Sequence, residues 1–279
     1  MTKRIITGAS IVVATVAILI FANTAVFPLA WALLSAIAVY ELYRALSMLD
    51  KRFQFISALC YASIMPIVCY YLKDARKGIE AIAIATMVYL LWQALYAVMF
   101  HSETPTAEMT TTSWCTLYIT IAFSALSLIY TIDPAHGIVM LLPVFLGTWA
   151  TDTCALFSGM LFGKHKLAPE LSPQKTIEGS IGGVVGCIAV FVLYGLIAGH
   201  LTDLTPHYPA LAISGLLVSV LSQVGDLFMS KIKREHTIKD FGTLFPGHGG
   251  VLDRYDSMLT IAPMHLLLCL MTGEFSLFA

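Results

Sequence analysis

The chain has 279 residues, of which 58% are hydrophobic and only 12% are charged, and its formal net charge is −1. An average soluble domain is about 45–50% apolar and about 25% charged, so this composition predicts a polytopic membrane protein. The near-neutral charge argues against nucleic-acid binding through a basic surface. The six cysteines are scattered through apolar segments, without CxxC or Cys/His metal spacing.

Apolar segments long enough to span a bilayer follow one another from the N-terminus onward. The first of them, 5–22, is longer than the typical hydrophobic region of a signal peptide, about 7–15 residues, so we expect a retained span. We therefore predict an all-α fold with about nine transmembrane helices. The segments are 5–22, 26–46, 54–72, 79–100, 114–132, 137–160, 179–200, 209–230 and 258–273.

The distribution of Lys and Arg predicts the orientation of these helices. With the N-terminus inside, the inside segments carry 13 Lys and Arg residues and the outside segments carry 3. Positive residues concentrate on the cytoplasmic side of membrane proteins. We therefore expect the N-terminus, and the two long polar breaks at 161–178 and 231–257, on the cytoplasmic side of the cell or inner membrane.

Charge is concentrated in two windows, 150–178 and 223–256, which hold 16 of the 33 charged residues. Ionisable groups beside membrane segments are costly to desolvate, so such groups suggest a functional site. Carboxylates mixed with cations and glycines suit a metal-bound polyphosphate.

A polar stripe marks the eighth apolar segment. Its members recur at spacings of three and four, which places them on one helical face. The stripe is either the wall of a cavity or a set of interhelical hydrogen bonds, and its aspartate needs a cation in either case. The members are Ser219, Ser222, Gln223, Asp226 and Ser230.

The first charged window contains Asp152 inside an apolar segment, which is an expensive position. Ser172 and Pro173 resemble the N-cap and first residue of a helix, and a helix N-terminus beside Lys175 would suit an anion. The alternative is an ordinary capped loop. Glycines at 179, 182, 183 and 186 predict close helix packing.

The second window ends in a glycine-rich turn followed by paired aspartates. Glycines at 247, 249 and 250 allow positive φ and close backbone approach to a ligand, and His248 between them either binds phosphate or belongs to the loop structure. Asp253 and Asp256 are three residues apart, so one helical turn would aim both the same way. With Asp226 they could hold Mg²⁺, while Lys239 and Arg254 would neutralise phosphate charge.

Residues 230–256 resemble the signature of the phosphatidate cytidylyltransferase, or CDP-diacylglycerol synthase, family. An upstream SPxKTxEG element at 172–179 and a GDL element at 225–227 match the family too, so the resemblance covers about 148–257. Three positions depart from common family residues: Met229, Leu156 and Tyr255. The matching signature residues are Ser230, Lys233, Arg234, Lys239, Asp240, Gly242, Pro246, Gly247, His248, Gly249, Gly250, Asp253, Arg254 and Asp256.

The resemblance implies that CTP and phosphatidic acid react to give CDP-diacylglycerol and pyrophosphate at the bilayer. It also implies Mg²⁺, a monovalent cation such as K⁺, and a homodimer. Residues 1–135 would anchor the protein and shape a cavity, and 136–279 would form the catalytic region. The implied roles are catalysis for Lys175, Lys239, Asp240 and Arg254, metal binding for Asp226, Asp253 and Asp256, and substrate binding for Ser172, Lys175, Ser222, Lys233, Arg234, His248, Gly249 and Gly250.

Two other functions fit parts of the sequence. A CTP-dependent polyprenol or phytol kinase would transfer the γ-phosphate to an alcohol, but the full signature favours the cytidylyltransferase. A secondary transporter would use Asp152 and Asp226 in an ion path, but it predicts repeat symmetry, and no repeat is visible. The sequence has no Walker, GxSxG or HExxH motif.

Overall fold

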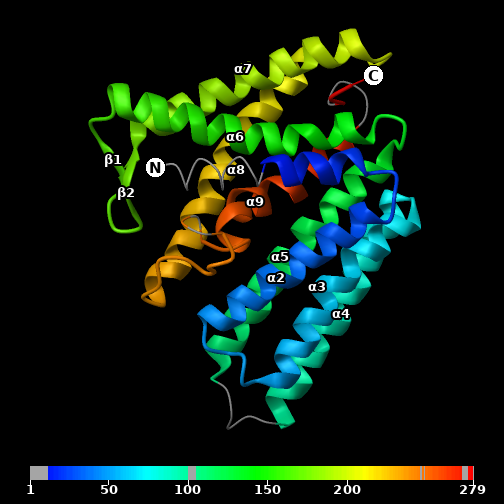
Figure 1. Cartoon of the computed structure of the whole chain (residues 1–279), viewed down its shortest axis with the longest axis vertical. Helices are drawn as coiled ribbons and strands as arrows, with labels where there is room; N and C mark the ends of the chain where they lie inside the picture. The colour runs from blue at the N-terminus through cyan, green and yellow to red at the C-terminus, as the bar shows by residue number, and fades with distance from the viewer. Residues whose placement is uncertain (1–11, 100–104, 246, 248, 272–275, 279) are drawn as a thin grey trace. The chain divides into compact units, whose positions relative to one another are not determined.

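The computed structural model describes residues 12–99, 105–245, 247, 249–271 and 276–278. The predicted all-α fold is confirmed, with one short hairpin added to the helices (Figure 1). The chain divides into two compact units. One comprises Met1–Ile132 and His236–Tyr255, and the other comprises Asp133–Glu235 and Asp256–Ala279.

The first unit is a helical bundle. It contains a helix over the described residues 12–20 and the helices α2 Val26–Ala45, α3 Arg52–Leu72, α4 Ala75–Met99 and α5 Thr106–Ile132. Helices α2, α3 and α5 pack against one another, and α4 packs on α3 and α5 (Figure 1). In the core, Phe27 and Trp31 make an edge-to-face contact with centroids 5.8 Å apart.

Helix α5 buries two threonines that satisfy their own hydrogen bonds. The hydroxyls of Thr116 and Thr120 each donate to the backbone carbonyl four residues earlier, at 2.7 Å. Such back-bonding lets a hydroxyl lie in apolar surroundings without an unpaired donor. Both threonines are accordingly buried.

The second unit contains α6 Gly137–Phe162, α7 Ile177–Leu201 and α8 Tyr208–Glu235, with most of α9, Leu252–Cys269. Helices α6 and α7 lie side by side (Figure 1). Side chains added at Gly182 or Gly186 of α7 would clash with Ser158 or Cys154 of α6. The predicted role of these glycines in close helix packing is therefore confirmed.

Among the described residues, seven helices, α2 to α8, are long and apolar enough to cross a membrane. The first predicted segment, 5–22, lies partly outside the described residues. Helix α9 is not among the seven: it has 18 residues and carries Asp253, Arg254 and Asp256 in its first turns. The prediction of about nine spans is therefore only approximate.

The predicted helix start at Ser172 and Pro173 is wrong. Residues Ser172–Thr176 form strand β2, which pairs antiparallel with β1, Lys166–Ala168. The helix begins at Ile177, and the hydroxyl of Thr176 caps it by accepting the N–H of Gly179 at 3.1 Å. Pro173 suits an edge strand, where no backbone N–H is needed.

A histidine joins two loops of the second unit. His136, the N-cap residue of α6, places Nδ1 2.7 Å from Asp133 Oδ2 and Nε2 2.8 Å from Asp203 Oδ1. The hydrogen bonds to Asp133 and then Asp203 raise the pKa of His136 above its usual value. The bridge connects the loop before α6 to the loop before α8.

This bridge predicts a pH-dependent stability. Because the pKa of His136 is raised, its contribution is complete below about pH 6.5, the ordinary histidine value, and is lost as pH rises through the raised pKa. His136→Ala should therefore lower the thermal midpoint more at pH 6 than at pH 9. Alanine at the exposed His236 is the control. An equal loss at both pH values would contradict the charged bridge.

Candidate active site

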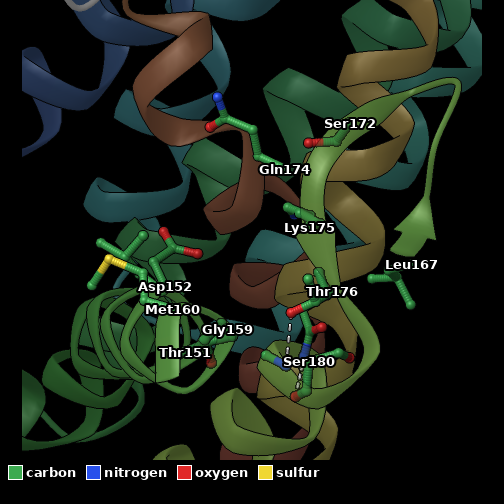
Figure 2. Close-up of a pocket in the computed structure, with 14 residues that line it drawn as sticks. Thr151, Asp152, Gly159, Met160, Leu167, Ser172, Gln174, Lys175, Thr176 and Ser180 are labelled. Atoms are coloured by element: carbon green, nitrogen blue, oxygen red, sulfur yellow. Dashed lines mark hydrogen bonds between the residues drawn. The ribbon is translucent and has the colours of Figure 1, made fainter. Parts of the chain in front are cut away.

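The second unit contains a cavity of about 500 Å³. Figure 2 shows Asp152 and Met160 of α6 on one side and Ser172, Lys175 and Thr176 of β2 on the other. Its wall combines charged and polar groups with apolar side chains. The lining residues are Thr151, Asp152, Ala155, Leu156, Gly159, Met160, Leu167, Ser172, Gln174, Lys175, Thr176, Gly179, Ser180 and Gln223.

The central polar contact is an ion pair between Lys175 of β2 and Asp226 of α8. Both side chains are partly buried, with 28% and 27% of their surfaces exposed, so solvent weakens their attraction less than at a free surface. The hydroxyl of Ser230 lies 3.4 Å from the other oxygen of Asp226. The hairpin thus carries the cation that Asp226 requires.

The polar stripe predicted on α8 is confirmed as a largely buried face. Ser219 and Ser222 are fully buried, and Gln223 donates to the backbone carbonyl of Ser180 on α7 at 3.3 Å. Gln223 also lines the cavity. Both alternatives for the stripe therefore hold: it makes a hydrogen bond to a neighbouring helix, and it contributes to the wall of a cavity.

A second carboxylate, Asp256 of α9, responds to the charge of Asp226. Desolvation, and then the negative charge of Asp226, raise the pKa of Asp256 above its usual value, while Lys233 opposes the shift. Helices α8 and α9 approach closely at Gly225, where a side chain would meet Thr260 and the backbone oxygen of Asp256. Carboxylates on two helices that approach this closely are suited to sharing a cation.

These residues fit Mg²⁺ bound together with a phosphate. No group of three or more His, Cys, Asp or Glu side chains within the described ranges is arranged to hold a metal. Mg²⁺, however, is commonly held by one or two carboxylates, with phosphate oxygens and waters completing its shell. Asp226 and Asp256 supply two carboxylates from helices that approach closely at Gly225, which matches that donor set.

In the first unit, Asp253 organises the loop that leads into α9, which we call the signature loop (described residues 241–245, 247 and 249–252). Its Oδ2 accepts the backbone N–H groups of Phe241, Gly242 and Gly250 at 2.8, 3.2 and 3.0 Å. The predicted positive φ is confirmed at Gly247 (79°) and Gly249 (80°). Gly250 lies outside the left-handed region, so its lack of a side chain has another cause.

The predicted site residues are distributed over both units. Arg234 Nε donates to the backbone carbonyl of Leu171 at 3.4 Å, which ties the end of α8 to the hairpin. His248 lies outside the described residues. The second unit contains Ser172, Lys175, Ser222, Asp226, Lys233, Arg234 and Asp256, and the first contains Lys239, Asp240, Gly249, Gly250, Asp253 and Arg254.

Two acidic residues next to these groups received no role from the sequence. Glu178 Oε2 accepts the backbone N–H groups of Lys164 and His165 at 3.1 and 3.2 Å, which anchors the hairpin that carries Lys175. Glu41 of α2 accepts the N–H of Leu252 at 2.9 Å. Glu41 lies inside an apolar span, so the argument applied to Asp152 could have identified it.

Comparison with known proteins identifies the family. Residues 2–272 match the model of the cytidylyltransferase family. The chain belongs to this family. A phosphatidate cytidylyltransferase of Bacillus subtilis (strain 168) is 30% identical over 97% of this chain and 98% of its own length. One of Staphylococcus epidermidis is 32% identical over 86% and 88%, and one of Haemophilus influenzae is 42% identical over 48% and 46%.

The cap at the base of the hairpin can be tested directly. Thr176→Ala removes the acceptor for the Gly179 N–H and should lower the free energy of unfolding by about 0.5–2 kcal/mol. Thr176→Ser retains the hydroxyl and should lose less. Thermal unfolding in detergent measures both. A serine variant as unstable as the alanine variant would show that the cap does not stabilise the protein.

Proposed function

We propose that this protein transfers CMP from CTP to phosphatidic acid, with CDP-diacylglycerol and pyrophosphate as products. The observation that carries the proposal is the similarity to a phosphatidate cytidylyltransferase over almost the whole length of both chains. The family match over residues 2–272 supports the same reaction. The protein is then an integral membrane enzyme of phospholipid biosynthesis.

The cavity of the second unit suits substrates of mixed character. Lys175 and the polar residues of β2 and α8 offer charge and hydrogen bonds to phosphate groups. Leu156 and Met160 line the same cavity and are 60% and 64% exposed, which gives it an apolar side suited to a lipid. The polar side of the cavity therefore suits the polyphosphate of a water-soluble substrate, and the apolar side suits a lipid that carries a phosphate monoester.

We assign metal binding to Asp226 and Asp256. Mg²⁺ held there would neutralise phosphate charge on CTP. The metal role of Asp253 stays a prediction, since the structure describes its carboxylate as an acceptor for loop N–H groups. The catalytic roles of Lys239, Asp240 and Arg254, and a bound K⁺, also stay predictions from the family resemblance.

The reaction needs positioning and charge stabilisation more than proton transfer. A phosphatidate oxygen attacks the α-phosphorus of CTP, a new P–O bond forms, and the bond to the β-phosphate oxygen breaks to release pyrophosphate. The second pKa of a phosphate monoester is about 6, so the nucleophile is already ionised near pH 7. Lys175 would hold phosphate oxygens and stabilise charge on the leaving group.

The distribution of Lys and Arg supports a site that faces the cytoplasm. The inside segments carry 13 Lys and Arg residues against 3 in the outside segments, and both charged windows lie in inside segments. Cytosolic CTP would reach the cavity from this side. A homodimer is a further prediction from the family resemblance.

The function is tested by pyrophosphate release from purified protein in lipid–detergent micelles with CTP, phosphatidic acid and Mg²⁺, each omitted in turn. We expect release only when all three are present, together with formation of CDP-diacylglycerol. CDP formation from an alcohol lipid, without pyrophosphate release, would instead identify a CTP-dependent lipid kinase.

The two aspartates predict a specific loss of turnover. Asp226→Asn and Asp256→Asn should each lower kcat by about 100-fold or more, because electrostatic groups at a transition state contribute on that order. Both variants should remain folded by size-exclusion chromatography in detergent. Lys73→Ala, at the exposed end of α3, is the control and should retain full activity. Wild-type turnover in either asparagine variant would refute the metal assignment.

A further inference from the structure

A buried carboxylate of α2 supports the signature loop of the first unit. Glu41 lies near the C-terminal end of the apolar span Val26–Ala45 and is only 3% exposed. Burying an acidic side chain there is costly unless specific partners compensate. Its Oε2 accepts the N–H of Leu252 at 2.9 Å, at the point where α9 begins.

Two signature glycines make room for this carboxylate. A Cβ atom at Gly250 would clash with Glu41, whose carboxylate atoms are its three nearest neighbours. A Cβ at Gly242 would also clash with Glu41. Because Gly250 does not have a left-handed φ, backbone conformation does not explain its lack of a side chain. The close approach of Glu41 does.

A second residue of α2 contacts the same loop. Arg44 Nη2 donates to the backbone carbonyl of Phe241 at 3.2 Å. Residues 41 and 44 are three apart in one helix and so share a face. Phe241 and Gly250 are also among the residues whose N–H groups Asp253 accepts. The loop is therefore held from α2 and from the first turn of α9.

We propose that Glu41, assisted by Arg44, is a positioning residue that fixes the signature loop, at Phe241, Gly242, Gly250 and Leu252, in its catalytic conformation. Helix α2 then supports catalysis through Glu41 and also anchors the protein in the membrane. The inference rests on the proposed function, because turnover is its main readout. The sequence predicted that Gly250 binds substrate; the proposal instead assigns Gly250 the role of leaving space for the Glu41 carboxylate.

A double-mutant cycle tests this proposal in full-length protein in lipid–detergent micelles. Wild type, Glu41→Ala, Gly250→Ala and the double variant are compared by kcat per folded molecule, with CTP and phosphatidic acid. A displacement of about 1 Å can cost about 100-fold in rate, so Gly250→Ala should lower kcat at least about tenfold in wild type. In the Glu41→Ala background the recess is open, and the same change should alter kcat by less than about twofold.

Three results would overturn the proposal. The first is an equal loss from Gly250→Ala in both backgrounds, which would mean that Gly250 contacts substrate directly. The second is a Gly250→Ala variant with wild-type kcat. The third is a Glu41→Ala variant with a lower thermal midpoint but an unchanged kcat per folded molecule, which would make Glu41 a stabilising residue only.

Controls separate the possible failures. Ser35→Ala alters a fully buried side chain of the same helix and should leave kcat unchanged. If Glu41→Ala does not fold, Glu41→Asp, whose shorter side chain partly opens the recess, replaces it in the cycle and should still reduce the loss from Gly250→Ala. If wild type makes no CDP-diacylglycerol, the proposed function fails, and hydrogen exchange at the Leu252 amide, faster in the Glu41 variants than in Ser35→Ala, tests the positioning alone.

Discussion

The organisation of the second unit depends on the need of Asp226 for a positive partner near the end of a largely apolar helix. Lys175 meets this need, but only because the β1–β2 hairpin brings it to α8. Glu178 and Thr176 in turn fix the base of that hairpin. Asp256 of α9 lies where that helix approaches α8 at Gly225, which is next to Asp226 in sequence. We propose that these two carboxylates, with Lys175, bind a metal-bound polyphosphate.

Five acidic residues of the signature loop, the hairpin and their neighbours divide into two groups by what they face. Glu41, Glu178 and Asp253 accept backbone N–H groups and hold loops or turns. Irregular backbone in an apolar protein needs such acceptors, because an unpaired buried N–H is costly. Asp226 instead pairs with Lys175, and Asp256 lies where α9 approaches α8. The first group shapes the loops, and for the second group we propose metal binding.

Local sequence patterns predicted the features that depend on neighbouring residues alone, namely helices, helix faces and turn conformations. Apolar runs predicted the helices, spacings of three and four predicted the buried face of α8, and two loop glycines were predicted to adopt positive φ. The helix start at Ser172 was wrong because strand pairing, which a capping pattern does not reveal, competes for residues 172–176. The contact between Glu41 and Leu252 joins residues 211 positions apart. No local pattern identifies such a partner, although the expense of a buried glutamate could have marked Glu41.

The central claim is that the Lys175–Asp226–Asp256 cluster binds a metal-bound polyphosphate, and binding of CTP in the absence of phosphatidic acid tests it most directly. Isothermal titration calorimetry of protein in lipid nanodiscs, with and without Mg²⁺, would compare wild type with Lys175→Met and Asp256→Asn. The account predicts Mg²⁺-dependent CTP binding by wild type that both substitutions weaken by at least about tenfold, equivalent to about 1.4 kcal/mol. Undiminished Mg²⁺-dependent binding by both variants would contradict it.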